Sequence, residues 1–173
     1  DGNFVPNLSY GMPIVEAIRK LTDLPIDVHL MISEPHRYAE DFVQAGADAI
    51  TFHIEATSDP RPTLKLIREQ GVAAGLALNP GTPLSAIEDH LDICDLILDA
   101  GSGGQKFNSD ALDKMRTLKD RVGERILLEV DGGINNQTIS SCSDAGAQLF
   151  VVGSAIFKTD NYNTAVSQLS SLA

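Results

Sequence analysis

The feature that most constrains this chain is a regular alternation of two kinds of segment along its 173 residues. Short runs of β-branched and apolar residues alternate with segments whose apolar residues recur every three or four positions, the spacing of one helix face. Strands and helices that alternate across short loops predict a parallel sheet covered by helices. The pattern predicts strands over residues 26–32, 49–54, 74–78, 94–98, 126–130 and 149–152, and helices over 13–21, 36–44, 62–70, 84–90, 109–119, 136–144 and 163–172.

One motif recurs where a helix meets the next strand. Ala45-Gly46-Ala47 precedes the strand at 49–54, and Ala145-Gly146-Ala147 precedes the strand at 149–152. A glycine ends a helix in a left-handed turn, and small neighbours let helix and strand approach closely. No linker-like or low-complexity segment divides the chain. We therefore expect a single domain over residues 1–173, which opens abruptly and is N-terminally incomplete.

Charge and cysteine content exclude several classes of protein. Lys and Arg number 13 against 24 Asp and Glu, so the net charge of −11 disfavours nucleic-acid and anionic-membrane partners. Cys94 and Cys142 are far apart and form no CxxC motif, which favours a reducing, cytoplasmic location. No apolar run reaches the length of a membrane span.

Polar residues alternate with apolar ones toward the carboxyl ends of several predicted strands. Strands of an open sheet buried on both faces read as continuous apolar runs. Inward polar residues on separate strands are instead typical of the mouth of a (β/α)8 TIM barrel. No G-x-G-x-x-G follows a strand, which disfavours a dinucleotide-binding sheet. The residues that share a face are Asp27, His29 and Met31, then Thr51, His53 and Glu55, then Glu129 and Asp131.

Glycine-rich turns follow the last three predicted strands. Glycine lets backbone N–H groups face a concavity without a Cβ in the way, which suits a bound phosphate. Any one of these turns could be an ordinary tight turn, but together they match the usual phosphate site of a (β/α)8 barrel. The turns are Gly101-Ser102-Gly103-Gly104, Asp131-Gly132-Gly133 and Gly153-Ser154.

His29 and Asp131 are the residues with candidate chemistry. His29 could be a core or rim histidine, or a ligand of Zn²⁺, Mn²⁺ or Fe²⁺ with carboxylates nearby. Asp131 could simply cap the turn that follows it, or act as a general acid/base or metal ligand. The residues alone leave both alternatives open.

Taken together, the motifs resemble the ribulose-phosphate 3-epimerase family over essentially the whole chain. DVHLM, LALNPGTP and EVDGGI are the most specific of them. The matching segments are DGNFVPN at 1–7, DVHLMI at 27–32, EP at 34–35, AGAD at 45–48, FHIEA at 52–56, GLALNPGTP at 75–83, GGQKF at 103–107, EVDGGI at 129–134 and GSAIF at 153–157.

The resemblance implies a (β/α)8 barrel that interconverts D-ribulose 5-phosphate and D-xylulose 5-phosphate in pentose phosphate metabolism, as a homo-oligomer. Such enzymes use a divalent metal, commonly zinc, with Fe, Mn or Co as alternatives, and a pair of acid/base aspartates. By position, His29 is a metal ligand against the substrate, and Asp131 is both metal ligand and acid/base. Met31 lies near the reacting carbons. The phosphate and substrate grip falls on Gly101, Ser102, Gly103, Gly104, Gly132, Gly133, Gly153 and Ser154.

The chain also departs from the family pattern. The first strands, with a serine and an H-x-D motif, are absent, and Asp1 aligns with the aspartate after that motif, not with the acid/base residue. About four residues are missing from the loop before Gly101, and Ser102 replaces an aromatic lid residue. Alternatives are a shortened, non-catalytic homologue that binds sugar phosphate, or a hexulose-6-phosphate 3-epimerase. A metal-dependent aldolase on the same fold would want a different set of site residues.

Overall fold

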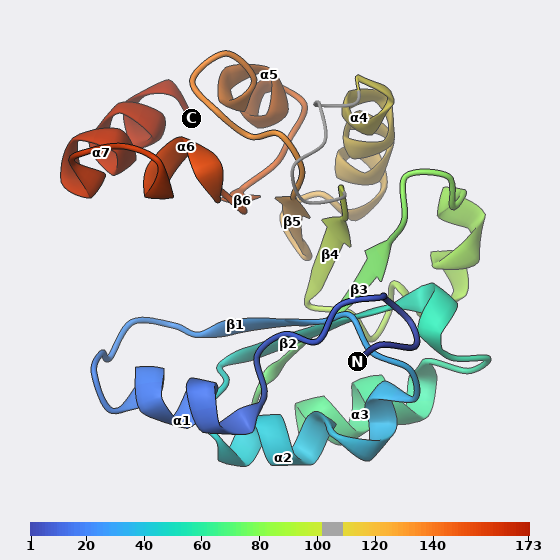
Figure 1. Cartoon of the computed structure of the whole chain (residues 1–173). Helices are drawn as coiled ribbons and strands as arrows, with labels where there is room; N and C mark the ends of the chain where they lie inside the picture. Colours follow the sequence, from blue (N-terminus) through green and yellow to red (C-terminus); the bar gives the residue numbers. More distant parts are fainter. Residues whose placement is uncertain (102–108) are drawn as a thin grey trace. The chain divides into compact units, whose positions relative to one another are not determined.

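The computed structural model describes residues 1–101 and 109–173 (Figure 1). Its strands are β1 (Asp27–Leu30), β2 (Ala49–His53), β3 (Ala73–Leu78), β4 (Leu96–Asp99), β5 (Leu127–Val130) and β6 (Leu149–Phe150). Its α-helices are α1 (Met12–Arg19), α2 (Ala39–Gln44), α3 (Arg61–Glu69), α4 (Asp110–Val122), α5 (Ile139–Asp144), α6 (Ser154–Phe157) and α7 (Tyr162–Leu172). Short 3-10 helices are η1 (Pro35–Arg37), η2 (Ile54–Ala56), η3 (Leu84–Ala86) and η4 (Glu88–His90).

The strands form a six-stranded sheet whose order, β1-β2-β3-β4-β5-β6, follows the chain. The pairs β1–β2, β2–β3 and β5–β6 are parallel, with His29 opposite Thr51 and Val130 opposite Phe150. Parallel neighbours need a crossover connection, which the helices between the strands supply. The predicted parallel α/β class is confirmed.

The chain divides into two compact units, each of which is described by itself. The first comprises Asp1–Ala77 and Ser85–Leu96, and the second comprises Leu78–Leu84 and Ile97–Ala173. The single-domain organisation expected from the sequence stays a prediction.

In the first unit, α1, α2 and α3 lie along the same face of β1, β2 and β3 (Figure 1). The helices bury their apolar stripes there, and Leu64 and Ile67 of α3 are fully buried, as are Ile50 and Phe52 of β2. Two polar residues of β2, Thr51 and His53, are also fully buried. The side chains of alternate residues on β2 therefore enter different surroundings, one apolar and one with polar groups.

In the second unit, α4 packs against β5 and against α5. Met115 and Leu118 of α4 and Cys142 of α5 are buried with Leu128 and Val130 of β5. Within the described residues, none of the helices combines the length and apolar character needed to cross a membrane.

The predicted glycine turns between helix and strand are confirmed at both repeats. Gly46 has φ +111° and Gly146 has φ +108°, values that side-chain-bearing residues rarely adopt. A Cβ on Gly46 would lie 2.6 Å from Cγ of Arg19, and a Cβ on Gly146 would lie 2.8 Å from Cγ of Lys119. Each glycine thus admits a long basic side chain across the end of the helix.

One predicted helix is of a different kind. Residues 84–90 form the two 3-10 turns η3 and η4, not an α-helix. Arg61 Nη2 donates a hydrogen bond of 2.6 Å to the carbonyl of Asp89 and pairs with the Asp92 carboxylate at 2.6 Å. A side chain distant in sequence thus binds a backbone carbonyl of this segment. The spacing of apolar residues cannot predict such a contact.

Smaller differences affect the C-terminal part of the chain. The helix α5 begins at Ile139 rather than at 136, because Asn135 and Thr138 form a hydrogen-bonded turn ahead of it. The strand β6 is only two residues long, and the four-residue α6 after it was not predicted. A segment of that length holds about one turn, too little for a periodic signal.

Candidate functional site

The first candidate group lies at the carboxyl ends of β1 and β2. The Nε2 atoms of His29 and His53 lie 2.8 Å apart. Their ring centroids are 4.9 Å apart, and the ring planes are inclined by 21°. His53 is fully buried, whereas His29 is only partly buried. The strand pairing brings the two together, because parallel register aligns His29 with Thr51, two positions before His53.

Glu55 and Phe4 complete this group. The Oε2 atom of Glu55, in η2, lies 3.2 Å from Nδ1 of His53. The ring of Phe4 covers His53, with 5.0 Å between centroids and a 52° tilt. Phe4 and Glu55 therefore enclose His53. The sequence predicted that His53 and Glu55 share a face of the strand.

Burial controls the charge of both histidines. Burial, and then the neighbouring His53, lower the pKa of His29 to about 4. Burial also lowers the pKa of His53, although the Glu55 carboxylate opposes that shift. His29 is therefore neutral at pH 7, the protonation state that a metal-binding imidazole requires.

The Asp1 carboxylate has a local structural role. Its Oδ1 accepts hydrogen bonds from the backbone N–H groups of Asn3 and Phe4, and its Oδ2 accepts one of 2.7 Å from Ser33. These bonds tie residues 1–7 to the segment that follows β1 and hold Phe4 near His53. The expectation that Asp1 is not the acid/base residue stays a prediction.

Met31 follows β1 and has 36% of its surface exposed. A methionine side chain with this exposure, two residues after His29, offers an apolar surface to a ligand. Its predicted contact with the reacting carbons stays a prediction.

The second candidate group lies where β4 and β5 end. The N–H of Gly101 donates to the carbonyl of Asp131 at 3.1 Å, and the N–H of Asp131 donates to the carbonyl of Asp99 at 3.1 Å. A Cβ on Gly101 would lie 2.6 Å from Asp131 O and from Gly132 Cα. The two backbones therefore touch at these glycines, and no other residue type fits.

Asp131 is half-buried beside this contact. Its Oδ1 accepts a hydrogen bond of 2.6 Å from the N–H of Gly132. Burial raises the pKa of Asp131, and the Gly132 N–H opposes part of that shift. A carboxyl whose pKa moves toward neutrality exchanges protons more readily at physiological pH, as a general acid/base must.

Asp99 and Lys114 form an ion pair that the sequence reasoning missed. Lys114 Nζ lies 3.3 Å from Asp99 Oδ1 and donates to the carbonyl of Asn79 at 3.3 Å. Asp99 is only 5% exposed, and burial raises its pKa while Lys114 opposes the shift. Its place at the end of a strand was the available signal, but Lys114 sits on a helix well separated in sequence.

The remaining predicted residues are placed only in part. Gly133 has φ +72°, and its carbonyl accepts hydrogen bonds from Asn135 and Thr138. Gly153 and Ser154 are exposed where α6 begins, and nothing lies within 4 Å of a Cβ built on Gly153. Ser102, Gly103 and Gly104 lie outside the described residues.

His29 belongs to the first unit, whereas Asp131 and the glycines belong to the second. In residues 1–101 and 109–173, the His, Cys, Asp and Glu side chains form no group of three or more that could hold a metal ion. His29, His53 and Glu55 are close, but they hydrogen-bond to one another.

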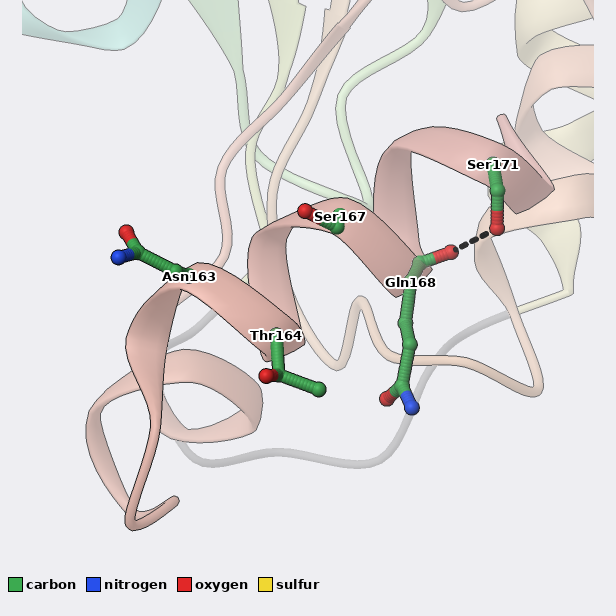
Figure 2. Close-up of a pocket in the computed structure, with 5 residues that line it drawn as sticks. All are labelled: Asn163, Thr164, Ser167, Gln168 and Ser171. Carbon is green, nitrogen blue, oxygen red and sulfur yellow. Dashed lines mark hydrogen bonds between the residues drawn. The ribbon is translucent and has the colours of Figure 1, made fainter.

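A polar pocket lies elsewhere, along α7 (Figure 2). Its lining bears hydroxyl and amide groups but no titratable group, and Ser171 Oγ donates to the carbonyl of Gln168 at 2.8 Å. None of the predicted site residues takes part. The lining residues are Asn163, Thr164, Ser167, Gln168 and Ser171.

The parallel strand order, with polar side chains at strand ends, defines an α/β protein of the TIM-barrel type. Similar solved structures are 3-hexulose-6-phosphate synthase from Salmonella typhimurium, with a TM-score of 0.78, and 3-keto-L-gulonate-6-phosphate decarboxylase from Vibrio cholerae, with 0.75. Both are 20% identical to this chain; each covers 94% of it, and it covers 79% and 80% of theirs.

The chain belongs to the ribulose-phosphate 3 epimerase family, whose model matches residues 1–157. Ribulose-phosphate 3-epimerase of Bacillus subtilis is 46% identical over 98% of this chain and 82% of its own length. The enzymes of that name from Synechocystis and Mycobacterium tuberculosis are 47% and 44% identical, over 96% and 98% of this chain and 76% and 77% of their own lengths. The family expected from the motifs is confirmed.

Proposed function

We propose that this chain is a ribulose-phosphate 3-epimerase, which interconverts D-ribulose 5-phosphate and D-xylulose 5-phosphate. The observation that carries the proposal is Asp131, a half-buried carboxyl with a raised pKa at the end of β5, in a chain of this family. Epimerisation at C3 removes a proton from one face of the carbon and returns a proton to the other face. A carboxyl in this state suits one of those transfers.

The proposed reaction also needs a second carboxylate, which the family pattern places in an H-x-D motif of a full (β/α)8 barrel. The motifs at residues 1–7 match the family segment directly after that motif. A carboxylate on each side of C3 allows one residue to act as base while the other acts as acid. Reversing these roles serves the opposite direction.

The proposed cofactor is a divalent metal, Zn²⁺ first and Fe, Mn or Co as alternatives, and it suits the donor chemistry of His29 and of Asp131, each taken by itself. Nδ1 of His29 and Oδ2 of Asp131 accept no hydrogen bond from the residues that the structure describes. Neutral imidazole and carboxylate are both common zinc ligands. A bound divalent metal would stabilise negative charge that develops on substrate oxygens during proton removal.

The glycine turns are proposed to bind the substrate phosphate. Their backbone N–H groups would supply hydrogen bonds to an anion, which a chain of net charge −11 otherwise repels. Met31 would contact the apolar face of the sugar carbons. The proposed contact residues are Gly101, Ser102, Gly103, Gly104, Gly132, Gly133, Gly153 and Ser154.

The test is to incubate the purified protein with D-ribulose 5-phosphate in D₂O and follow the reaction by NMR. We expect D-xylulose 5-phosphate to appear with deuterium at C3, because the returned proton comes from solvent-exchanged carboxyls. A hexulose 6-phosphate, assayed in parallel, distinguishes the sister activity. Binding of the pentulose phosphate without deuterium incorporation would support the non-catalytic alternative and refute epimerisation.

Assembly and location are part of the same proposal. We propose a cytoplasmic homo-oligomer acting in pentose phosphate metabolism, with no nucleic-acid or membrane partner. Light scattering coupled to size-exclusion chromatography would give the oligomeric state directly. A mass of one chain at micromolar concentration would contradict the oligomer.

A further inference from the structure

The buried group around His53 contains a series of hydrogen bonds in which two residues, Glu55 and His53, have no role in the proposed reaction. It runs from the Glu55 carboxylate through Nδ1 and Nε2 of His53 to Nε2 of His29. The two contacts measure 3.2 Å and 2.8 Å. His53 has no exposed surface, so water does not compete for its two ring nitrogens.

The donor and acceptor roles in this series of hydrogen bonds follow from counting protons. Two N–H groups facing each other at 2.8 Å would repel, and so would two lone pairs, so the Nε2–Nε2 contact holds one proton. The Glu55 carboxylate is an acceptor, which places a proton on Nδ1 of His53. His53 then presents a lone pair at Nε2, and His29 must be the donor. His29 therefore carries its proton on Nε2 and its lone pair on Nδ1.

Packing holds these hydrogen-bonded side chains in place. The ring centroid of Phe4 lies 5.0 Å from that of His53, and the backbone N–H of Phe4 donates to the Asp1 carboxylate. The two imidazole rings are nearly parallel, inclined by 21°. A second partner that orients a metal-binding histidine typically changes metal affinity by about 10–100-fold.

We propose that Glu55 and His53 are positioning residues, which fix the tautomer of His29 so that Nδ1 is its metal-binding atom. The inference rests on the proposed function for the role of the metal, but its geometric part concerns the metal-free protein. Nδ1 of His29 accepts no hydrogen bond from the described residues, as a ligand atom should.

The first experiment reads the tautomers directly. Two-dimensional ¹⁵N–¹H spectra of the histidine rings, recorded on metal-free protein, distinguish protonated from unprotonated nitrogens. We expect protons on Nε2 of His29 and on Nδ1 of His53. A proton on Nδ1 of His29 would overturn the proposal, whatever the protein does with a sugar phosphate.

The second experiment measures zinc affinity by competition with a chromophoric chelator. Glu55→Gln replaces an acceptor by an amide that can also donate, so the tautomer preference weakens. His53→Phe keeps an aromatic ring but removes the acceptor for His29, and it carries the test where Glu55→Gln folds poorly. We expect Zn²⁺ affinity about 10–100-fold lower in both variants.

Glu69→Gln is the matched control, because Glu69 is an exposed carboxylate at the end of α3. It should bind Zn²⁺ like the parent protein. Zinc affinities of Glu55→Gln and His53→Phe within twofold of the parent would overturn the positioning role. Both measurements omit the substrate, so an inactive protein with the expected tautomers and affinities refutes only the epimerase proposal.

Discussion

At the scale of single residues, burial changes the acid–base character of the two main candidates in opposite directions. It lowers the pKa of His29 to about 4 and raises the pKa of Asp131. In both cases burial disfavours the charged form, which is the cation of histidine and the anion of aspartate. The same physical cause thus leaves a neutral imidazole and a carboxyl ready to exchange a proton.

Replacing Asp131 tests its role in the reaction. Asp131→Asn keeps the size and can still accept the hydrogen bond from Gly132, but it cannot take up a proton. We expect kcat to fall by about 10²–10⁴-fold, the usual contribution of a general acid/base, with an unchanged circular dichroism spectrum. Asp144→Asn, at the end of α5, is the control and should keep full activity. Full activity of Asp131→Asn would remove Asp131 from the mechanism.

The contact between Gly101 and Gly132 leads to a prediction for stability. A Cβ on Gly132 would lie 2.7 Å from Gly101 Cα, and its φ of +97° disfavours any other residue. We expect Gly132→Ala to lower the free energy of unfolding by about 1–3 kcal/mol, measured by urea denaturation. Gly81→Ala is the control, since nothing lies within 4 Å of a Cβ there. Equal stability of the two variants would contradict the close approach.

At the scale of helices and strands, side chains fasten the ends of each element to the next. Arg19, at the end of α1, donates to the carbonyls of Thr22 and Leu24 and pairs with Asp48 at 2.7 Å. The same side chain crosses Gly46, which ends the turn after α2. The Arg19 side chain thus stabilises the turn after α1, because it donates to backbone carbonyls that would otherwise lack partners.

The cysteines test the packing of α5 and of the turn before β4. Cys142 and Cys94 are 1% and 3% exposed, and burial raises the pKa of Cys142 to about 11. Thiols react as thiolates, so a rise from 9.0 lowers the reactive fraction of Cys142 at pH 8 by about 100-fold. We expect both thiols to resist a chromogenic disulfide reagent in native protein and to react together in urea. Rapid native labelling of Cys142 would show that α5 opens.

At the scale of the whole molecule, this chain covers 82% of its Bacillus subtilis relative and has the family's motifs from residue 1 onward. The solved neighbours, at 20% identity, share the fold alone. The family assignment rests on sequence identity and the fold on strand order, and the two agree.

Metal removal tests the whole-molecule proposal. Dialysis against a strong chelator should abolish epimerase activity while leaving the helical content unchanged, because most of the core is apolar and independent of the metal. Zn²⁺ should restore activity, and Fe²⁺, Mn²⁺ and Co²⁺ are then compared at equal concentration. Undiminished activity in chelated protein, with no metal by elemental analysis, would exclude a metal role.

The sequence by itself determined the alternation of strands and helices, the glycine turns and the family. Each depends on local spacing, such as Gly46 after α2 or Asp131 before Gly132, and local spacing is visible in one dimension. Only the tertiary structure decided which distant side chains meet. The bonds of His53 with His29, Lys114 with Asp99, and Arg61 with Asp89 join residues on different elements. Such contacts depend on strand register and helix packing, which is why the 3-10 form of the helix at 84–90 and the Asp99–Lys114 pair were not predicted.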